Sequence, residues 1–205
     1  MEIKHIKCDK ASFIVLEDIF DDKEQKYLWK EVDFLCDENK LQDPFGTGSD
    51  MRNDGTPKKS NKGLWISEYY SNNSSNYMSL YKKGLNQLSN QKDDLTKYDI
   101  NLKLFFMTNF DSTLLSYYEN EDYYESHIDI ACYTYVFWLF KEPKRFSGGD
   151  LSFPELNYKV NVKSNMGVLF PSWVDHKVDK IEMYDKMDRY NSNGRFCFST
   201  FFHIR

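Results

Sequence analysis

Three residues in this sequence offer the ligands of a divalent metal ion. His127 and Asp129 are separated by one residue, so both side chains can project to the same side of a strand or strand end. His176 follows a strongly apolar segment, which suits a ligand held at the mouth of a barrel. Two imidazoles and one carboxylate leave three coordination positions open for substrate and dioxygen. A His-x-Asp tripeptide is a weak signal alone, so the prediction depends on the surrounding elements.

The composition excludes several other classes of protein. The 205 residues suit one domain, and 40% hydrophobic residues, with 15 Tyr and 16 Phe, argue for a packed core. A formal charge of -5 has the wrong sign for a protein that binds mainly nucleic acid. The four cysteines form no Cys-x-x-Cys pair, so we expect reduced thiols. Without a signal-like start or a long apolar run, we expect a cytoplasmic protein that does not enter the membrane.

The first hundred residues combine a strand, helices and a polar loop. Residues 12–16 are rich in strand formers, and apolar residues near helical spacing predict a helix over 17–35. Residues 43–63 are crowded with Gly, Pro, Asn, Asp and Ser and predict a long mobile loop, in which Gly46 to Gly63 is a candidate substrate lid. A second helix is predicted within 74–98, breaking down around residues 90–94.

Beyond residue 100 the apolar pattern changes to that of short strands. Eight strands in sequence predict a mainly β fold, a barrel or jelly roll with helices supporting one sheet. The predicted strands are 101–109, 112–118, 132–140, 150–153, 158–162, 166–170, 177–184 and 195–204. We expect Gly148 and Gly149 to form a turn with positive φ.

The last predicted strand suggests where an anion would bind. Its alternation places Arg195, Cys197 and Ser199 on one face and three phenylalanines, Phe196, Phe198 and Phe202, on the other. We assign the phenylalanine face to the helices, so Arg195 faces the barrel interior. A buried guanidinium without an anionic partner carries a heavy desolvation cost. We therefore predict an anion beside Arg195.

Several further segments lie around the three candidate ligands within residues 112–203. In chain order they are Tyr118 and Tyr124 before His127-Ile128-Asp129, then 134–139 (TYVFWL), 147–153 (SGGDLSF) and 167–172 (GVLFPS), and finally His176 and Gly194-Arg195. With these segments in this order, the sequence resembles the Fe(II)- and 2-oxoglutarate-dependent dioxygenases of the prolyl 4-hydroxylase-like branch. The resemblance implies a double-stranded β-helix, a cupin-like jelly roll, spanning residues 101–205 and preceded by supporting elements in 1–100.

The same resemblance assigns residue roles and cofactors. It implies Fe(II) bound by His127, Asp129 and His176, with Arg195 pairing with the distal carboxylate of 2-oxoglutarate. Tyr118, Thr134 and Trp138 are expected to line the cosubstrate pocket. Dioxygen is the second cosubstrate and ascorbate a candidate reductant. The implied reaction is hydroxylation of a C–H bond, with release of succinate and CO2.

Two features depart from the family pattern. Glu121 stands where a glycine is often found between the two tyrosines, which alters a turn. His176 and Arg195 are 19 residues apart, a longer interval than in many relatives. We interpret the charged segment 179–193 as an extended hairpin before the last strand, with Arg189 as the alternative partner for 2-oxoglutarate.

Several functions remain open on the sequence. The resemblance favours a prolyl residue in a peptide or protein as substrate, and the alternative is a free amino acid or another small molecule. A non-catalytic metal-binding jelly roll and a zinc hydrolase come from other classes, and neither needs Arg195. Nucleic-acid demethylation is disfavoured because Phe201 occupies the place of a second arginine, and halogenation because Asp129 is present. We expect a monomer or weak dimer.

Overall fold

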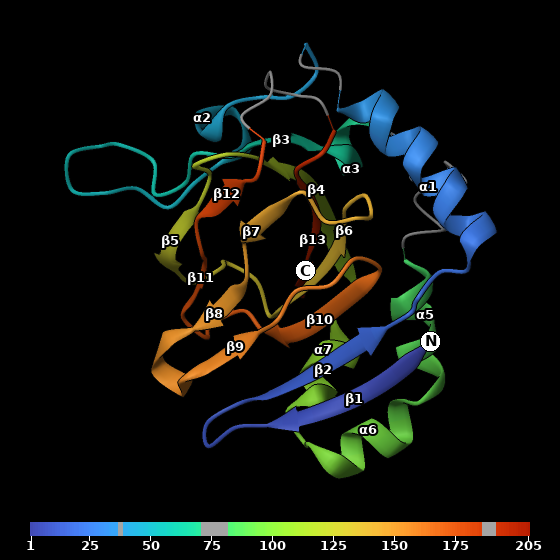
Figure 1. Ribbon diagram of the computed structural model, residues 1–205. Coiled ribbons are helices and arrows are strands. Elements are labelled where there is room, and N and C mark those ends of the chain that lie inside the picture. The colour runs from blue at the N-terminus through green and yellow to red at the C-terminus, as the bar shows by residue number, and fades with distance from the viewer. Residues whose placement is uncertain (37–38, 71–81, 186–191) are drawn as a thin grey trace.

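The computed structural model describes residues 1–36, 39–70, 82–185 and 192–205. Two sheets face each other and helices cover the outside of the larger one (Figure 1). The larger sheet has the strand order β1-β2-β10-β6-β13-β4-β3 and the smaller one β5-β11-β8-β9, while β7 and β12 form a separate pair. Every pairing between these strands is antiparallel. This is the jelly-roll architecture that the sequence predicts.

The strands of the larger sheet come from both halves of the chain. They are β1 (Glu2–Lys7), β2 (Ser12–Glu17), β3 (Lys62–Trp65), β4 (Phe110–Tyr118), β6 (Tyr133–Leu139), β10 (Met166–Pro171) and β13 (Arg195–His203). The smaller sheet contains β5 (Tyr124–His127), β8 (Leu151–Phe153), β9 (Tyr158–Val160) and β11 (His176–Val178). The remaining pair is β7 (Phe146–Gly148) with β12 (Ile181–Met183), and a 3-10 turn spans Pro154–Leu156.

Most helices pack on one face of the larger sheet, while α2 contacts the edge strand β3. They are α1 (Asp22–Leu35), α2 (Pro44–Thr47), α3 (Ile66–Tyr69), α5 (Lys83–Asn90), α6 (Lys92–Tyr98) and α7 (Leu102–Met107). Apolar residues of α1, α5, α6 and α7 form one core cluster with the outward face of the sheet, including Phe196 and Phe198 of β13. A second cluster fills the space between the two sheets and contains Cys197. The predicted division of the β13 faces is therefore confirmed.

The first long helix starts later than predicted because its start is set by a capping box. Asp21 Oδ1 accepts hydrogen bonds from the backbone amides of Lys23 and Glu24, both at 2.9 Å, and Glu24 Oε2 accepts one from the Asp21 amide at 2.9 Å. These contacts satisfy amides that the first helical turn leaves without partners. The helix therefore begins at Asp22 rather than at residue 17.

The strand predicted over 101–109 is wrong, because most of this segment is helix α7. Leu102 and Phe105 are three residues apart and both are buried, whereas Leu104 and Met107 are exposed. Phe105 packs edge-on against Phe202 with ring centroids 5.2 Å apart. Burial at a spacing of three is helical, and a short apolar run does not distinguish this spacing from a strand. The following strand, β4, begins at Phe110.

Other boundaries differ in detail from the prediction. The predicted second helix appears as α5 and α6, which meet at Gln91, while residues 71–81 lie outside the described part of the chain. The predicted strand over 177–184 is two strands on different sheets, β11 and β12. The segment predicted as a hairpin instead pairs β12 with β7, and residues 186–191, including Arg189, are outside the described residues.

Two glycines make the turn between β7 and β8. Gly148 has φ 71° and Gly149 has φ 74°, so the predicted turn is confirmed. A Cβ atom at Gly148 would also collide with the carbonyl oxygen of Lys180. The two positions thus require glycine for both conformation and space. In the described residues, no helix has the length and apolar character needed to cross a membrane.

Candidate metal and cosubstrate site

The three predicted metal ligands lie together at one end of the cavity between the sheets. His127 ends β5 and His176 begins β11, and the two residues are directly paired in the antiparallel register. Asp129 follows β5, and its backbone amide donates to the Ser172 carbonyl oxygen at 3.0 Å. Each of the three residues has a possible ligand atom that lies within 4.8 Å of those of the other two.

The backbone sets the orientation of both histidine rings. His127 Nδ1 lies 2.8 Å from the Glu125 carbonyl oxygen, and His176 Nδ1 lies 2.9 Å from the Val174 carbonyl oxygen. A carbonyl only accepts, so each Nδ1 carries the proton and each Nε2 presents a lone pair. The two Nε2 atoms lie 3.6 Å and 3.4 Å from the Asp129 carboxylate oxygens. All three donors therefore converge on one point.

Burial and neighbouring charges together set the protonation of these groups. Burial alone would lower the pKa of His176, but Asp129 outweighs this effect and raises it while no metal is bound. Burial, followed by repulsion from His176, lowers the pKa of His127 to about 4, so its imidazole is neutral at pH 7. Burial alone would raise the pKa of Asp129, but the two histidines outweigh this effect and lower it, so the carboxylate is ionised. A neutral imidazole and a carboxylate are the forms that bind a divalent cation.

A hydroxyl pair positions the carboxylate ligand. Thr134 Oγ1 donates to Asp129 Oδ2 at 2.7 Å and lies 2.8 Å from Ser172 Oγ. Thr134 also borders the cavity, as predicted for the cosubstrate pocket. Hydrogen bonds of this kind orient metal ligands and tune their affinity. Ser172 was not among the predicted site residues, although it lies in the apolar segment that precedes His176.

The two histidine strands are also joined next to the ligands. The Ser126 hydroxyl donates a short hydrogen bond to the carboxylate of Asp175. Ser126 precedes His127 and Asp175 precedes His176, so this contact bridges the two segments that carry the imidazoles. It adds to the β5–β11 pairing in holding the histidine rings at a centroid separation of 4.3 Å.

Arg195 is fully buried at the start of β13. It faces the cavity side of the strand, where the next two residues of that face, Cys197 and Ser199, line the same cavity as the metal ligands. Its Nη1 donates to the Gly149 carbonyl oxygen, and its Cζ lies 4.3 Å from the centroid of the Tyr118 ring. Among the described residues, its buried Nε and Nη2 have no hydrogen-bond partner. Two unpaired guanidinium donors leave a place for an anion, because burial of an unpaired charge is costly.

The remaining predicted site residues surround this cavity. Tyr118 is paired with Arg195 in the β4–β13 register, and Trp138 is paired with Cys197 in the β6–β13 register. Both aromatic side chains are almost fully buried and both line the cavity with the three metal ligands. The structure thus brings together every residue that was predicted for the metal and the cosubstrate, and leaves aside only Arg189, which it does not describe.

A lysine of the cavity was missed by the sequence analysis. Lys59 is only 5% exposed and lines the cavity, and Phe201 contributes to the same wall. Lys59 lies in the polar segment before β3, and nothing in its local sequence distinguishes it from its neighbour Lys58. The Tyr124 ring, by contrast, belongs to the tyrosine pattern before His127, and it stacks on the His127 ring with centroids 3.5 Å apart.

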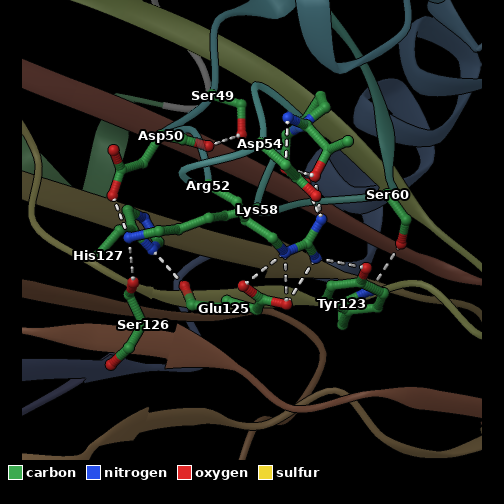
Figure 2. A network of polar contacts seen from close by, with 12 residues as sticks. Ser49, Asp50, Arg52, Asp54, Lys58, Ser60, Tyr123, Glu125, Ser126 and His127 are labelled. Carbon is green, nitrogen blue, oxygen red and sulfur yellow. Dashed lines mark hydrogen bonds and ion pairs between the residues drawn. The ribbon is translucent and has the colours of Figure 1, made fainter.

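The predicted lid is attached to strand β5 by a network of polar contacts (Figure 2). We call residues 49–60 the strap. Arg52 forms an ion pair with Glu125 at 2.6 Å and also donates to the Tyr123 hydroxyl at 2.9 Å. Lys58 pairs with Asp50 at 2.5 Å. The short helix α2 precedes the strap and was not predicted; movement of the strap over a substrate stays a prediction.

The comparisons with known proteins match the fold and not the sequence. No protein-family model matches this sequence, and no curated protein is similar to it in sequence. A Pseudomonas putida prolyl-4-hydroxylase is similar in structure, with a TM-score of 0.63 and 16% identity over 96% of this chain and 94% of that one.

Two further prolyl hydroxylases give similar results. The viral collagen prolyl hydroxylase of Paramecium Bursaria Chlorella virus-1, solved as a 2OG complex, has a TM-score of 0.51 and 12% identity over 95% of this chain and 97% of its own. A Phytophthora capsici prolyl 4-hydroxylase has a TM-score of 0.57 and 15% identity over 93% of this chain and 58% of its own. This chain therefore has the jelly-roll fold of the prolyl 4-hydroxylases.

Proposed function

We propose that this chain is an Fe(II)- and 2-oxoglutarate-dependent dioxygenase that hydroxylates a C–H bond. The observation that carries the proposal is a pair of features, one in the cavity and one beside its Tyr118 wall. Two histidines and one aspartate converge on a point, and the cavity-facing side of β13 also holds a fully buried guanidinium with two unpaired donors. A non-catalytic metal-binding module or a zinc hydrolase would need the first feature only. The second feature, the guanidinium, suits a dicarboxylate that binds the metal at one end and Arg195 at the other.

The donor set fits Fe(II). His127 and His176 would each bind through Nε2 and Asp129 through a carboxylate oxygen, and this facial set leaves three positions open. When bound, the metal and 2-oxoglutarate supply the oxidising power for C–H hydroxylation by dioxygen, with succinate and CO2 as products; ascorbate remains a candidate reductant. Thr134 holds the Asp129 carboxylate in place through its hydroxyl.

Arg195 would bind the distal carboxylate of 2-oxoglutarate through Nε and Nη2. The third guanidinium nitrogen, Nη1, already donates to the Gly149 carbonyl oxygen, and the Tyr118 ring lies against the guanidinium. These two contacts hold the guanidinium in one orientation. A bidentate contact between guanidinium and carboxylate is strong and directional. Tyr118 and Trp138 add apolar walls that exclude water from the reacting groups.

We propose a prolyl residue in a peptide or protein as the first candidate substrate. The similarity in fold to three prolyl hydroxylases supports this choice, at identities of 12 to 16%. The alternative substrate is a free amino acid or another small molecule.

An anaerobic titration tests the proposed function without a known substrate. Metal-free protein would receive Fe(II) and then 2-oxoglutarate, and the weak visible absorption band of a 2-oxo acid chelated to iron would be recorded. We expect the band in the wild type and its absence in Asp129→Ala, with circular dichroism showing that the variant is folded. A folded, iron-loaded wild type that gives no band with 2-oxoglutarate would overturn the proposal.

A further inference from the structure

The cavity contains a lysine that the proposed reaction does not use. Lys59 is 5% exposed and borders the cavity together with the three metal ligands. Its Nζ lies 5.5 Å from the centroid of the Tyr124 ring, and that ring is stacked on the His127 ring at 3.5 Å. The ammonium is therefore no more than 9.0 Å from the centroid of the His127 ring. Among the described residues, no hydrogen bond or ion pair joins Lys59 to an acidic group.

Backbone pairing directs this side chain inward. Lys59 forms an antiparallel bridge with Tyr124 of β5. On either side of the bridge, the Glu125 amide donates to the Lys58 carbonyl oxygen at 2.9 Å and the Ser60 amide donates to the Tyr123 carbonyl oxygen at 3.2 Å. Neighbouring side chains on an extended segment point to opposite sides. Lys58 accordingly points out toward Asp50, and Lys59 points into the cavity.

The polar network of the strap holds this arrangement in place (Figure 2). Besides its ion pair with Glu125, Arg52 donates to the Thr56 hydroxyl at 2.9 Å and to the Pro57 carbonyl oxygen at 2.8 Å. The Tyr124 hydroxyl accepts a hydrogen bond from the Asp50 amide at 3.1 Å. Together with the backbone contacts of Lys58 and Ser60, the contacts of Asp50 and Arg52 connect both ends of the strap to residues 123–125. The inward position of Lys59 therefore does not depend on Lys59 itself.

A count of formal charges shows that one anion is missing. Asp129 is the only carboxylate among the described residues that line the cavity. With a divalent metal, a doubly charged 2-oxoglutarate, Asp129 and Arg195, the charges of the loaded site cancel. Lys59 then adds one positive charge that no further carboxylate among the described cavity residues balances. A buried cation of this kind is costly unless an anion arrives with another ligand.

We propose that Lys59 binds a carboxylate group of the substrate, so that the substrate is an acid with its carboxylate close to the carbon that reacts. This inference rests on the proposed function and deepens it. Leu114 and Phe201 line the cavity as well and offer an apolar wall for the carbon skeleton. The carboxylate can come from the α-carboxyl of a free amino acid or C-terminal residue, or from an acidic side chain beside the target residue.

Matched pairs of acids and amides test the proposal. The full-length protein is loaded anaerobically with Fe(II) and 2-oxoglutarate, and the change in the visible absorption band is titrated with each probe. L-proline and glycyl-L-proline are compared with their C-terminal amides, and a blocked Ala-Pro-Glu tripeptide is compared with its Gln counterpart. The first two pairs test the α-carboxyl, and the third tests a side-chain carboxylate.

The protein variants are chosen to separate charge from structure. Lys59→Met removes the ammonium and keeps a side chain of similar length, while Lys59→Arg keeps a cation. The matched control is Lys58→Met, which removes the same charge from the adjacent residue outside the cavity. The affinity of each variant for 2-oxoglutarate is measured in the same titration, because Lys59 is expected to leave it unchanged within about 3-fold.

The expected result is an acid preference that depends on Lys59. At least one acid should bind the wild type about 10- to 100-fold more tightly than its amide, the range for a hydrogen bond to a charged group. The preference should vanish in Lys59→Met, survive in Lys58→Met and recover in part in Lys59→Arg.

Other outcomes overturn the inference and separate it from the proposed function. Equal binding of acid and amide, a preference that persists in Lys59→Met, or no acid binding at all would each refute a substrate carboxylate at Lys59. A large loss of 2-oxoglutarate affinity in Lys59→Met would assign the lysine to the cosubstrate instead. In all these cases the band with 2-oxoglutarate is still present in the wild type, whereas failure of the proposed function removes the band itself.

Discussion

Replacement of Arg195 by methionine tests the cosubstrate assignment most directly. In the wild type, Nε and Nη2 are buried and have no partner within the described part of the chain, so a carboxylate that reaches them can form two charge-assisted hydrogen bonds. We take about 3 to 4 kcal/mol for the loss of such a pair. Since about 1.4 kcal/mol corresponds to a factor of ten, the dissociation constant for 2-oxoglutarate should rise about 100- to 1,000-fold.

The assay is the anaerobic titration of iron-loaded protein with two 2-oxo acids. 2-Oxoglutarate has a distal carboxylate and 2-oxobutyrate does not, while both chelate iron in the same way. The double comparison of protein and ligand isolates the interaction between Arg195 and the distal carboxylate. We expect a large penalty of Arg195→Met for 2-oxoglutarate and little change for 2-oxobutyrate.

Two results would refute this reasoning. Equal affinity of wild type and Arg195→Met for 2-oxoglutarate would show that the distal carboxylate binds elsewhere. An equal penalty for both acids would show that the substitution damages the metal site instead. Loss of folding is not the expected cause of either result, because methionine removes a buried charge whose only hydrogen bond in the described chain is to the Gly149 carbonyl oxygen.

Three further predictions concern residues around the site. Thr134→Val should weaken Fe(II) binding about 10- to 100-fold by removing the hydrogen bond to Asp129, whereas Thr134→Ser should keep both the hydrogen bond and the affinity. Equal iron affinity in the two variants would contradict a positioning role for Thr134. Burial lowers the pKa of Lys59 to about 8, against 10.5 for an exposed lysine. Between pH 8 and pH 10.5 the unfolded chain therefore binds more protons than the folded chain, and the stability of the wild type rises with pH. At pH 7 the free energy of unfolding of metal-free Lys59→Met should therefore exceed that of the wild type by about 3 kcal/mol, and near pH 10.5 the difference should be gone. Urea unfolding at several pH values measures this difference. A difference that does not change with pH would argue against a buried ammonium. Arg52→Ala should release the strap, so hydrogen exchange of the Ser60 and Glu125 amides should become at least about 10-fold faster, while exchange of the β13 amides stays unchanged. Unchanged exchange at Ser60 would show that the ion pair with Glu125 does not hold the strap.

Much of the β core could be predicted from the sequence because the decisive signals are local. Alternation along β13 separates a phenylalanine face from a polar face, and each face lies where the pattern indicated. The short spacing of His127 and Asp129 and the apolar strand before His176 predict the candidate metal ligands, which the structure brings together. These features depend on the two-residue period of a strand, which is written directly in the order of the residues.

Local patterns are less informative where an element is short. The segment 101–109 has the apolar content of a strand, yet Phe105 packs on Phe202 and Tyr133 as part of a helix. Likewise, β7 and β12 are only three residues each, and their pairing joins segments more than thirty residues apart. Tertiary packing decides such elements because their own preference for helix or strand is weak.

By itself, the sequence determined the alternating strands, the candidate metal-ligand triad and an arginine for which we expect an anion. Only the tertiary structure decided what surrounds them. It gave Arg195 two unpaired donors, gave Asp129 its hydrogen bond from Thr134, and placed Lys59 in the cavity through pairing with a strand more than sixty residues away. The cost of an unpaired buried charge depends on which groups the fold excludes from water. That burial is decided by contacts between residues that are far apart in the sequence.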